Sequence, residues 1–508
     1  MSKIIKMYVP FILILCFAVL LAPGNGMAKT VLRTVNTVDP VNLDPAHLFQ
    51  TPDRNIAQQV YQGLVTYDYA ADAPYPIIPV LAESYEVAED AKSIIFKLHK
   101  GVQFHHGYGE FTAEDVVFTL KRHQDPKAVS RAKNQVADVE NVEALDKYTV
   151  KITLKNPSAL SLIRCLAWQT AGCMMSKKAT LELGDKLERF PVGTGPFYFA
   201  DWQPGEKVIL KKFDQYWGKP QKIDEIVYWI IKEQTVALGA LEKGDLDVVP
   251  LSQMGSYDRG KSIKNIDILF SKGATLIYLY TFVQAVKPMD DLRVRRALMH
   301  AIDLKELARR VGPQVRYFPS PFAPTAFAAT DEFWNYEYDV EKAKKLLAEA
   351  GYPNGFKLKM VYTTGSLYEP VALEVKRYWQ QVVDVDLRLV ERGVWFKTIT
   401  QPTQHVVAFG LARAVPFLFA EACQTDNSRN YGGYSNPKVD EIIEKARWAT
   451  SEAESRRLWR EFQRLVTEDV SHMWAAMGIS IVAVKKNLKG IIPHPTPGIW
   501  LMEDAYFE

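Results

Sequence analysis

Few residues in this sequence have a spacing that would support catalysis. We find no Gly-x-Ser-x-Gly nucleophile turn, no His-Glu-x-x-His helix, no Cys-x-x-Cys pair and no Walker loop. Gly193-Thr194-Gly195 is only the start of a dinucleotide-binding glycine pattern, and Pro196 follows where a helix would have to open. A tight turn before a strand is the better interpretation. The pattern favours a protein without a catalytic site over a secreted hydrolase.

Metal and cofactor chemistry also has little support. His105 and His106 form the only adjacent histidine pair in the chain. If this segment is a strand, neighbouring side chains point to opposite faces and cannot easily share one metal ion. We therefore expect neither a metal site nor a cofactor.

The N-terminus has the pattern of a secretory signal peptide. Lys3 and Lys6 precede an apolar run at residues 7–22, and residues 26–28 supply small side chains for cleavage. Cys16 does not follow a small residue, which favours free export over a lipid anchor. No later segment approaches the roughly 20 apolar residues of a transmembrane helix. The sequence thus predicts a signal peptide at residues 1–28 and a periplasmic protein.

Composition limits the partners and the number of domains. The chain has 508 residues and a formal net charge of +3, so nothing indicates a nucleic acid as partner. At about 150 residues per domain, roughly three compact units are expected. Cys165 and Cys173 could form a disulfide in an exported protein, or these two and Cys423 could all be buried free thiols.

The apolar pattern predicts a mixed α/β fold. Residues 357–362 and 385–389 alternate as strands, and a helical period lies between them, which is the pattern of a parallel sheet with a crossover helix. Asp290 or Asp291 is expected to begin a helix that continues to Gly312-Pro313. Further helices are expected over 340–350 and after Ser451.

The most informative stretch is 81–122. Alternation around Ile94–His99 predicts a strand that pairs with the segment before it, and a glycine-rich turn then leads to Thr112. Thr112 and Asp115 have the spacing of an N-cap and its capping-box partner. The stretch therefore predicts two strands followed by a capped helix.

This stretch is similar to the signature of the family 5 extracellular solute-binding proteins, the peptide-type receptors that deliver ligands to ABC importers. Further similarities to that family cover nearly all of the chain after residue 28. They lie at Gly193–Phe199, Trp202–Glu206, Tyr216–Gly218, Leu241–Asp247, Asp291–Leu298 and Ala343–Pro353.

The resemblance implies a type II periplasmic binding protein, an α/β fold with mixed sheets flanked by helices and two lobes around a cleft. An extra subdomain inserted into lobe I is expected at residues 63–191. Hinges are expected near 283–288 and 478–484. Mapped onto this chain, lobe I comprises residues 29–62, 192–285 and 482–508, and lobe II comprises 286–481.

The resemblance also indicates candidate ligand contacts. Trp395 matches a tryptophan at the start of a lobe II helix, and Asn430 and Tyr431 match a loop near the cleft. For Trp395 and Tyr431, burial in a lobe is an equally good interpretation, because aromatic side chains dominate cores and binding sites alike.

One segment departs from the peptide-binding members of the family. These typically have a tryptophan after the glycine that matches Gly410 and, a few residues later, an aspartate that pairs with the α-ammonium group of the ligand. Here Leu411 and Ala414 occupy those positions, and Arg413 lies between them. A guanidinium in a cleft would favour a carboxylate through bidentate hydrogen bonds, although a surface or interlobe role is equally open. Phe282 similarly replaces an asparagine of the family.

The resemblance implies capture by domain closure and delivery to an ABC permease driven by cytoplasmic ATPases. We expect a monomer that binds a peptide or a peptide-sized solute. The alternative is the same receptor retuned to a non-peptide and anionic solute, such as an organic acid, an opine or a short saccharide.

Overall fold

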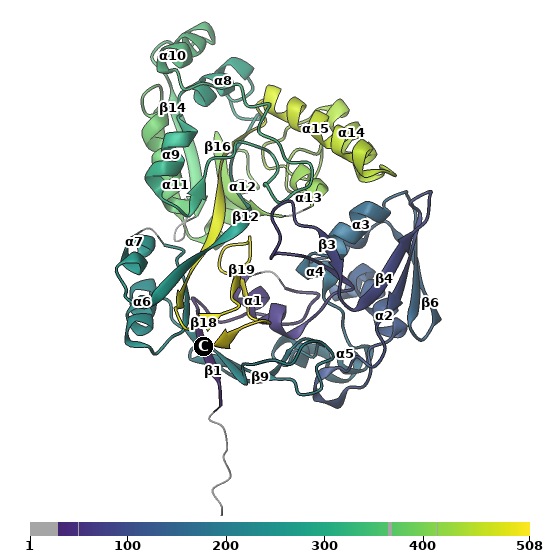
Figure 1. Ribbon diagram of the computed structural model, residues 1–508. Helices are drawn as coiled ribbons and strands as arrows, with labels where there is room; N and C mark the ends of the chain where they lie inside the picture. Colours follow the sequence, from purple (N-terminus) through teal and green to yellow (C-terminus); the bar gives the residue numbers. More distant parts are fainter. Residues whose placement is uncertain (1–28, 49, 254, 364–367, 414) are drawn as a thin grey trace, which may run out of the picture.

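The computed structural model describes residues 29–48, 50–253, 255–363, 368–413 and 415–508. The predicted signal peptide and Ala414 lie outside these residues. The described chain is an α/β protein, as the sequence predicts. Its elements form three main groups around the long strands β12 and β17 (Figure 1). Among its helices, none is both long and apolar enough to cross a bilayer.

A four-stranded sheet with the order β1-β10-β9-β8 forms the first group. Only β1 and β10 are parallel in it. Two short antiparallel pairs from the C-terminal segment, β18 with β21 and β19 with β20, lie near this sheet (Figure 1). The strands and helices of this group are β1 (Val31–Asn36), β8 (Phe197–Gln203), β9 (Lys207–Lys212), β10 (Glu225–Ile230), β18 (Leu488–Lys489), β19 (Ile492–Pro493), β20 (Trp500–Leu501), β21 (Tyr506–Phe507), α1 (Thr51–Val60), α6 (Gln234–Lys243) and α7 (Ser256–Lys261).

The second group contains the predicted capped helix. Its sheet has the order β4-β5-β7-β6, and β2 pairs with β3 beside it. Thr112 and Asp115 form the expected capping box, in which the Asp115 carboxylate accepts the Thr112 N–H at 2.9 Å. The elements are β2 (Val65–Tyr67), β3 (Ile77–Pro79), β4 (Ala82–Val87), β5 (Ser93–Leu98), β6 (Val139–Asp146), β7 (Thr149–Leu154), α2 (Ala113–Gln124), α3 (Ala159–Leu166), α4 (Gln169–Gly172), α5 (Lys177–Leu183) and the 3₁₀ turns η1 (His105–Gly107), η2 (Pro126–Ala128), η3 (Lys133–Val136) and η4 (Gly184–Glu188).

The third group is built on a sheet with the order β11-β17-β12-β16-β14-β15, with β13 paired to β17. β14 and β15 are parallel and joined by α11, as predicted. The elements are β11 (Val248–Pro250), β12 (Ile266–Phe282), β13 (Val315–Arg316), β14 (Lys357–Thr363), β15 (Asp384–Val390), β16 (Val406–Ala412), β17 (His472–Lys485), α8 (Leu292–His300), α9 (Leu304–Val311), α10 (Val340–Glu349), α11 (Tyr368–Trp379), α12 (Arg392–Ile399), α13 (Pro416–Ala420), α14 (Pro437–Arg447) and α15 (Glu452–Glu468).

β12 and β17 connect the first and third groups. They pair antiparallel, with register shifts between Phe270 and Leu276. At one end β17 lies between β11 and β12, and at the other end β12 lies between β17 and β16. The predicted lobe boundaries stay predictions, because sheet order alone cannot assign strands that serve both regions.

Alternation along β12 separates two apolar cores. Ile277 and Leu279 point into a core shared with α6 and α12–α15, whereas Tyr278, Tyr280 and Phe282 point into a core covered by α8–α11. The first core also contains Val35 of β1, so it extends into the first group.

One predicted helix is wrong in its extent. The expected helix from Asp290 or Asp291 to Gly312 is divided into α8 and α9. Asp291 caps α8 by accepting the Arg293 N–H at 2.8 Å. Asp303 caps α9 by accepting the Glu306 N–H at 2.9 Å. The second cap supplies an alternative partner for the backbone, and the helix restarts there.

The remaining sequence alternatives concern cysteines and histidines. Cys165, Cys173 and Cys423 are buried free thiols, and burial raises the pKa of each to about 12. The strand assumed for His105 and His106 is wrong, because the pair lies in the turn η1. Within the described residues, no cluster of metal-ligating side chains occurs.

Gly193-Thr194-Gly195 forms a tight turn that holds α1. The Gly195 N–H donates to the Val60 carbonyl at 2.9 Å, and His105 contacts the turn through the carbonyl of Gly195, also at 2.9 Å. A Cβ at Gly193 would overlap the Val60 carbonyl oxygen. This close approach explains the glycines and confirms the turn predicted before β8.

We expect Gly193→Ala to lower the free energy of unfolding by about 2 kcal/mol, because backbone atoms cannot yield to the added methyl group. Gly239→Ala is the control, since a Cβ in the middle of α6 meets no atom within 4 Å. That change should stabilise the helix by about 0.5 kcal/mol. Denaturant unfolding measures both, and equal effects would contradict the packing argument.

Stability should fall on acidification. Burial lowers the pKa of His105, His472 and His494 to about 3 and that of His123 to about 4. Below about pH 6.5 the unfolded chain, with histidine pKa values of about 6.5, binds protons at these histidines, whereas the folded chain keeps them neutral. The stabilisation is complete above about pH 6.5 and is lost as the pH falls toward 4, by up to about 1.4 kcal/mol per pH unit for each histidine.

Denaturant unfolding at pH 7 and pH 5 checks this slope. His472→Asn should flatten it, because that change removes one buried titrating group from the protein. His99→Asn, at a partly exposed site beside Trp217, is the control. Identical slopes for wild type and His472→Asn would refute the assignment.

Candidate functional site

The loop after β19 lies against β12 where the three groups meet. The Thr275 N–H donates to the Pro495 carbonyl at 3.2 Å, and the hydroxyl oxygens of Thr275 and Thr496 are 2.8 Å apart. The Arg413 N–H donates to the Thr275 carbonyl at 3.1 Å. These bonds place the C-terminal loop beside the end of β16, in the middle of the molecule (Figure 1).

His494 is fully buried in this loop. Its Nδ1 accepts the Thr496 N–H at 2.9 Å, and its ring lies 4.3 Å from Tyr69 and 6.0 Å from Trp168. Burial, and then repulsion from Arg54, lowers its pKa to about 3. The ring is therefore neutral at physiological pH with its proton on Nε2, and this N–H has no acceptor among the described residues.

Arg54 of α1 also lies beside Trp168. Only 8% of the residue is exposed, and its guanidinium carbon is 5.9 Å from the Trp168 ring centroid. The Nε atom is buried without a hydrogen-bond acceptor, and no described carboxylate forms an ion pair with this arginine. Burial lowers its pKa, although Asp53 opposes the shift.

Arg413 follows β16 and is half-buried. Its Nη1 donates to the Ala412 carbonyl at 2.7 Å, and it forms no ion pair within the described chain. Burial lowers its pKa to about 9, with repulsion from Arg429 and Arg54 adding to the shift and Glu421 opposing it. The side chain remains charged at neutral pH. Glu421 itself forms an ion pair with Arg429 at 3.1 Å.

We name the region formed by Arg54, Trp168, His494, Thr496 and Arg413 the junction site. It joins side chains from α1, the start of α4, the C-terminal loop and the end of β16. The site has an excess of positive charge from Arg54 and Arg413. Two buried donors in it, Arg54 Nε and His494 Nε2, lack acceptors among the described residues. Such an arrangement can bind the oxygens of an acid.

Of the residues predicted from the sequence, only Arg413 lies in the junction site. Tyr431 is half-buried near Arg429, and its ring is 5.3 Å from Phe409. Trp395 is buried behind Phe409, with ring centroids 6.2 Å apart, and its Nε1 donates to the Ala408 carbonyl at 3.2 Å. These aromatic residues form one wall of the apolar core on the β16 face.

Asn430 and Phe282 occupy different settings. The Asn430 amide donates to the carbonyls of Gln424 (3.0 Å) and Tyr434 (2.7 Å) and accepts the Tyr434 N–H (3.1 Å), so it shapes its own loop. Phe282 is fully buried in the opposite core, 6.2 Å from Trp379. The strand period places it on the face of β12 away from Leu279.

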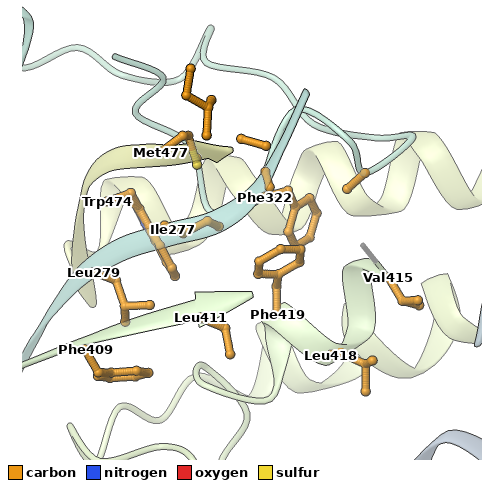
Figure 2. Close-up of a cluster of buried hydrophobic side chains, with 14 of the residues drawn as sticks. Ile277, Leu279, Phe322, Phe409, Leu411, Val415, Leu418, Phe419, Trp474 and Met477 are labelled. Carbon is orange, nitrogen blue, oxygen red and sulfur yellow. The ribbon is translucent and has the colours of Figure 1, made fainter. Parts of the chain in front are cut away.

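Leu411 fills an apolar cluster rather than an open cleft. Figure 2 shows it near Phe419 and Leu418, with Ile277 and Leu279 on the neighbouring strand. Leu411 is 6% exposed. Leu411 is therefore a core residue on the β16 strand.

A cavity of about 200 Å³ lies beside Glu421, between η3 and the α13–α14 segment. Asn134 and Ala137 line one side, and Phe417 and Gln424 line the other. A larger groove of about 1080 Å³ along α14 and α15 is lined mostly by charged side chains and shares no residue with the junction site.

Polar contacts join the second and third groups beside this cavity. Arg447 Nη2 is 3.0 Å from Asp138 Oδ2, and the Ser161 hydroxyl donates to the Arg447 carbonyl at 2.9 Å. Arg164 and Glu452 form a second ion pair at 3.1 Å. We name these contacts the latch. They hold the two groups together on one side of the junction site.

Sequence reasoning missed Arg54, His494 and the latch. A charged residue in a short amphipathic helix normally marks its solvent face, and nothing in the spacing links residues 54, 413 and 494. Only the tertiary fold brings them together.

The fold is that of the two-lobed periplasmic binding protein class, an α/β protein with mixed sheets flanked by helices. The family described as bacterial extracellular solute-binding proteins, family 5 middle, matches residues 76–416. The chain belongs to this family.

Known proteins with similar sequences or structures are binding proteins. Glutathione-binding protein GsiB of Escherichia coli strain K12 is 29% identical over 96% of this chain and 95% of its own length. The periplasmic binding protein DppA of Helicobacter pylori, solved with the peptide STSA, has a TM-score of 0.81 and 25% identity, covering 94% of this chain and 98% of that one. MoaA of A. tumefaciens R10, solved with mannopinic acid, has a TM-score of 0.80 and 29% identity, covering 95% and 100%.

Asp138→Asn should weaken the latch by about 1–2 kcal/mol, because it leaves a half-buried Arg447 without its ion-pair partner. We expect small-angle X-ray scattering of the unliganded protein to show a larger radius of gyration. Glu86→Gln is the control, since its ion pair with Lys97 is exposed and 3.9 Å long. A radius unchanged by Asp138→Asn would contradict a role of the latch in closure.

Proposed function

We propose that this protein is the exported receptor of an ABC importer, that it captures a peptide or peptide-sized solute between its lobes and that it delivers the solute to a membrane permease. Family membership over two thirds of the chain supports the receptor class. The proposal places the protein in the periplasm as a monomer, after removal of residues 1–28.

The junction site is the observation that carries the proposal. Buried donors from separate parts of the chain converge there without acceptors of their own. Leaving a buried donor unpaired costs about 1–3 kcal/mol, so a fold tolerates several of them together where a ligand completes the bonds. A solute bound at the junction would contact both lobes and so favour the closed state.

Arg413 and Tyr431 are our proposed direct contacts from lobe II. Trp395 supports Phe409 and Tyr431 from behind, and Asn430 holds the loop that carries Tyr431. We leave Phe282 out of the site because it faces the opposite core.

Closure is proposed to occur by bending of β12 and β17. Their pairing is interrupted between Phe270 and Leu276, and Gly478 lies opposite Leu276 in β17. This interruption overlaps the predicted hinge at 478–484 and lies before the one predicted at 283–288. A local loss of ladder pairing lets strands bend with little loss of core packing.

The alternative ligand class is a non-peptide anionic solute. Arg413 without an ion pair favours it, and the solved neighbour with mannopinic acid shows that this fold accommodates such a ligand in another protein. Peptide and acid ligands can be distinguished by whether binding needs a free ammonium group.

We expect one solute in a broad panel of peptides, organic acids, opines and saccharides to raise the melting temperature. At 100 times the Kd the stabilisation is about 2.7 kcal/mol, which is a shift of a few degrees. X-ray scattering with the same solute should show a smaller radius of gyration. Binding without compaction, or turnover of the solute, would contradict a closing receptor.

A further inference from the structure

Two buried arginines in this protein have opposite surroundings. Arg295, 6% exposed, donates to the carbonyls of Met289 (2.7 Å), Asp469 (2.9 Å) and Val470 (3.0 Å), so the fold satisfies it. Arg54 is 8% exposed and has neither a carbonyl nor a carboxylate partner for its side chain in the described chain. Arg295 has the environment of a structural residue, and Arg54 does not.

The second buried donor at the junction is neutral. His494 uses Nδ1 to accept the Thr496 N–H, so its proton lies on Nε2, which has no acceptor within the described residues. Arg54 and His494 both lie beside Trp168, whose ring centroid is 5.9 Å from the guanidinium carbon and 6.0 Å from the imidazole centroid, and the charge of Arg54 contributes to the lowered pKa of His494. A cation and a neutral N–H beside the same ring, each without an acceptor, suit a carboxylate, which has two oxygens and can accept from both.

The charges at the junction do not balance. Arg429 is paired with Glu421, whereas Arg54 and Arg413 have no ion-pair partner in the described chain. The two unpaired guanidiniums come from α1 in the first group and from the end of β16 in the sheet of the third group. The carboxylates of Asp53 and Glu421 act on Arg54 and Arg413 without forming ion pairs with them, so each guanidinium is left to pair with a carboxylate of a solute.

We propose that the solute carries two carboxylates, one bound by Arg54 and His494 and the other by Arg413, and that a free ammonium group is not required. The inference rests on the proposed function and specifies the substrate class of the same site. The acid groups would join the two lobes by binding a guanidinium from each, so the closed state would depend on the charge of the solute.

A stability comparison tests Arg54 without any ligand. Arg54→Met removes an unpaired buried charge, so the unliganded protein should melt at an equal or higher temperature than wild type. Arg295→Met is the matched control and should melt several degrees lower, because it leaves buried carbonyls without donors. If the melting temperature falls as much in Arg54→Met as in Arg295→Met, Arg54 has a structural role and the proposal is overturned.

Calorimetric titration tests the substrate class with matched probes. Glutarate, N-acetylglutamate, glutathione and mannopinic acid would each be compared with forms in which one carboxylate is converted to an amide. We expect a diacid to bind, each amide to bind at least about 30-fold more weakly, and N-acetylation to have little effect. Arg54→Gln and Arg413→Gln should weaken diacid binding by a similar factor, whereas Arg464→Gln on the surface of α15 should not.

His494 has a separate prediction within this scheme. His494→Gln retains an N–H donor and should keep most of the affinity for the diacid, whereas His494→Leu should lose about 10-fold. An equal loss of diacid affinity in both variants would show that the ring of His494 acts only through packing, which would overturn its assignment as a donor to the first carboxylate.

The outcomes separate this inference from the proposed function. A solute that binds and compacts the protein with equal affinity as acid and as amide, or only with a free ammonium group, would overturn the inference and leave the receptor function intact. If no solute of the broad panel binds, the receptor function fails, and the inference fails with it. Diacid binding that Arg54→Gln and Arg413→Gln do not affect would place the solute elsewhere and overturn the inference.

Discussion

The structure depends on one pair of antiparallel strands, β12 and β17, that is shared by two regions of the fold. β17 pairs with β11 at its C-terminal end, and β12 pairs with β16 at its C-terminal end. Backbone hydrogen bonds cannot be left unmade in a buried strand, so the two regions can move relative to each other only where the pairing is already interrupted. The register shifts lie between Phe270 and Leu279, and Thr275, which anchors Arg413 and the C-terminal loop, lies among them.

Close packing elsewhere keeps the charged junction rigid. The turn at Gly193–Gly195 lies directly against the end of α1, and the capping box of α2 fixes the neighbouring subdomain. The backbone of α1, which carries the buried Arg54, is held in this way. A buried guanidinium without an ion-pair partner is costly for stability, which is the pattern expected where binding rather than folding has determined the residue.

Electrostatics is the property of the junction site on which the proposed ligand class depends. Leu411 is packed in the core, and Arg413 follows it two residues later with a charge that no ion pair balances within the described chain. In a region of low dielectric constant the sign of charge decides which solute can enter, because an unpaired charge of the wrong sign costs several kcal/mol. The charge of Arg413 at the end of β16 therefore favours a solute that carries an acid group.

The sequence by itself determined the elements whose physics is local. The capping box at Thr112, the turn before β8, the parallel β14–β15 unit and the family signature at 81–122 are each recognised within one continuous stretch of the sequence. It also indicated Arg413 as a residue of interest. Only the tertiary structure decided that Arg54, Arg413 and His494 meet, that Phe282 faces the opposite core and that α8 and α9 are separate helices. The physical reason is that burial and long-range charge interactions arise from contacts between residues hundreds of positions apart. The local spacing of residues in the sequence does not predict such contacts.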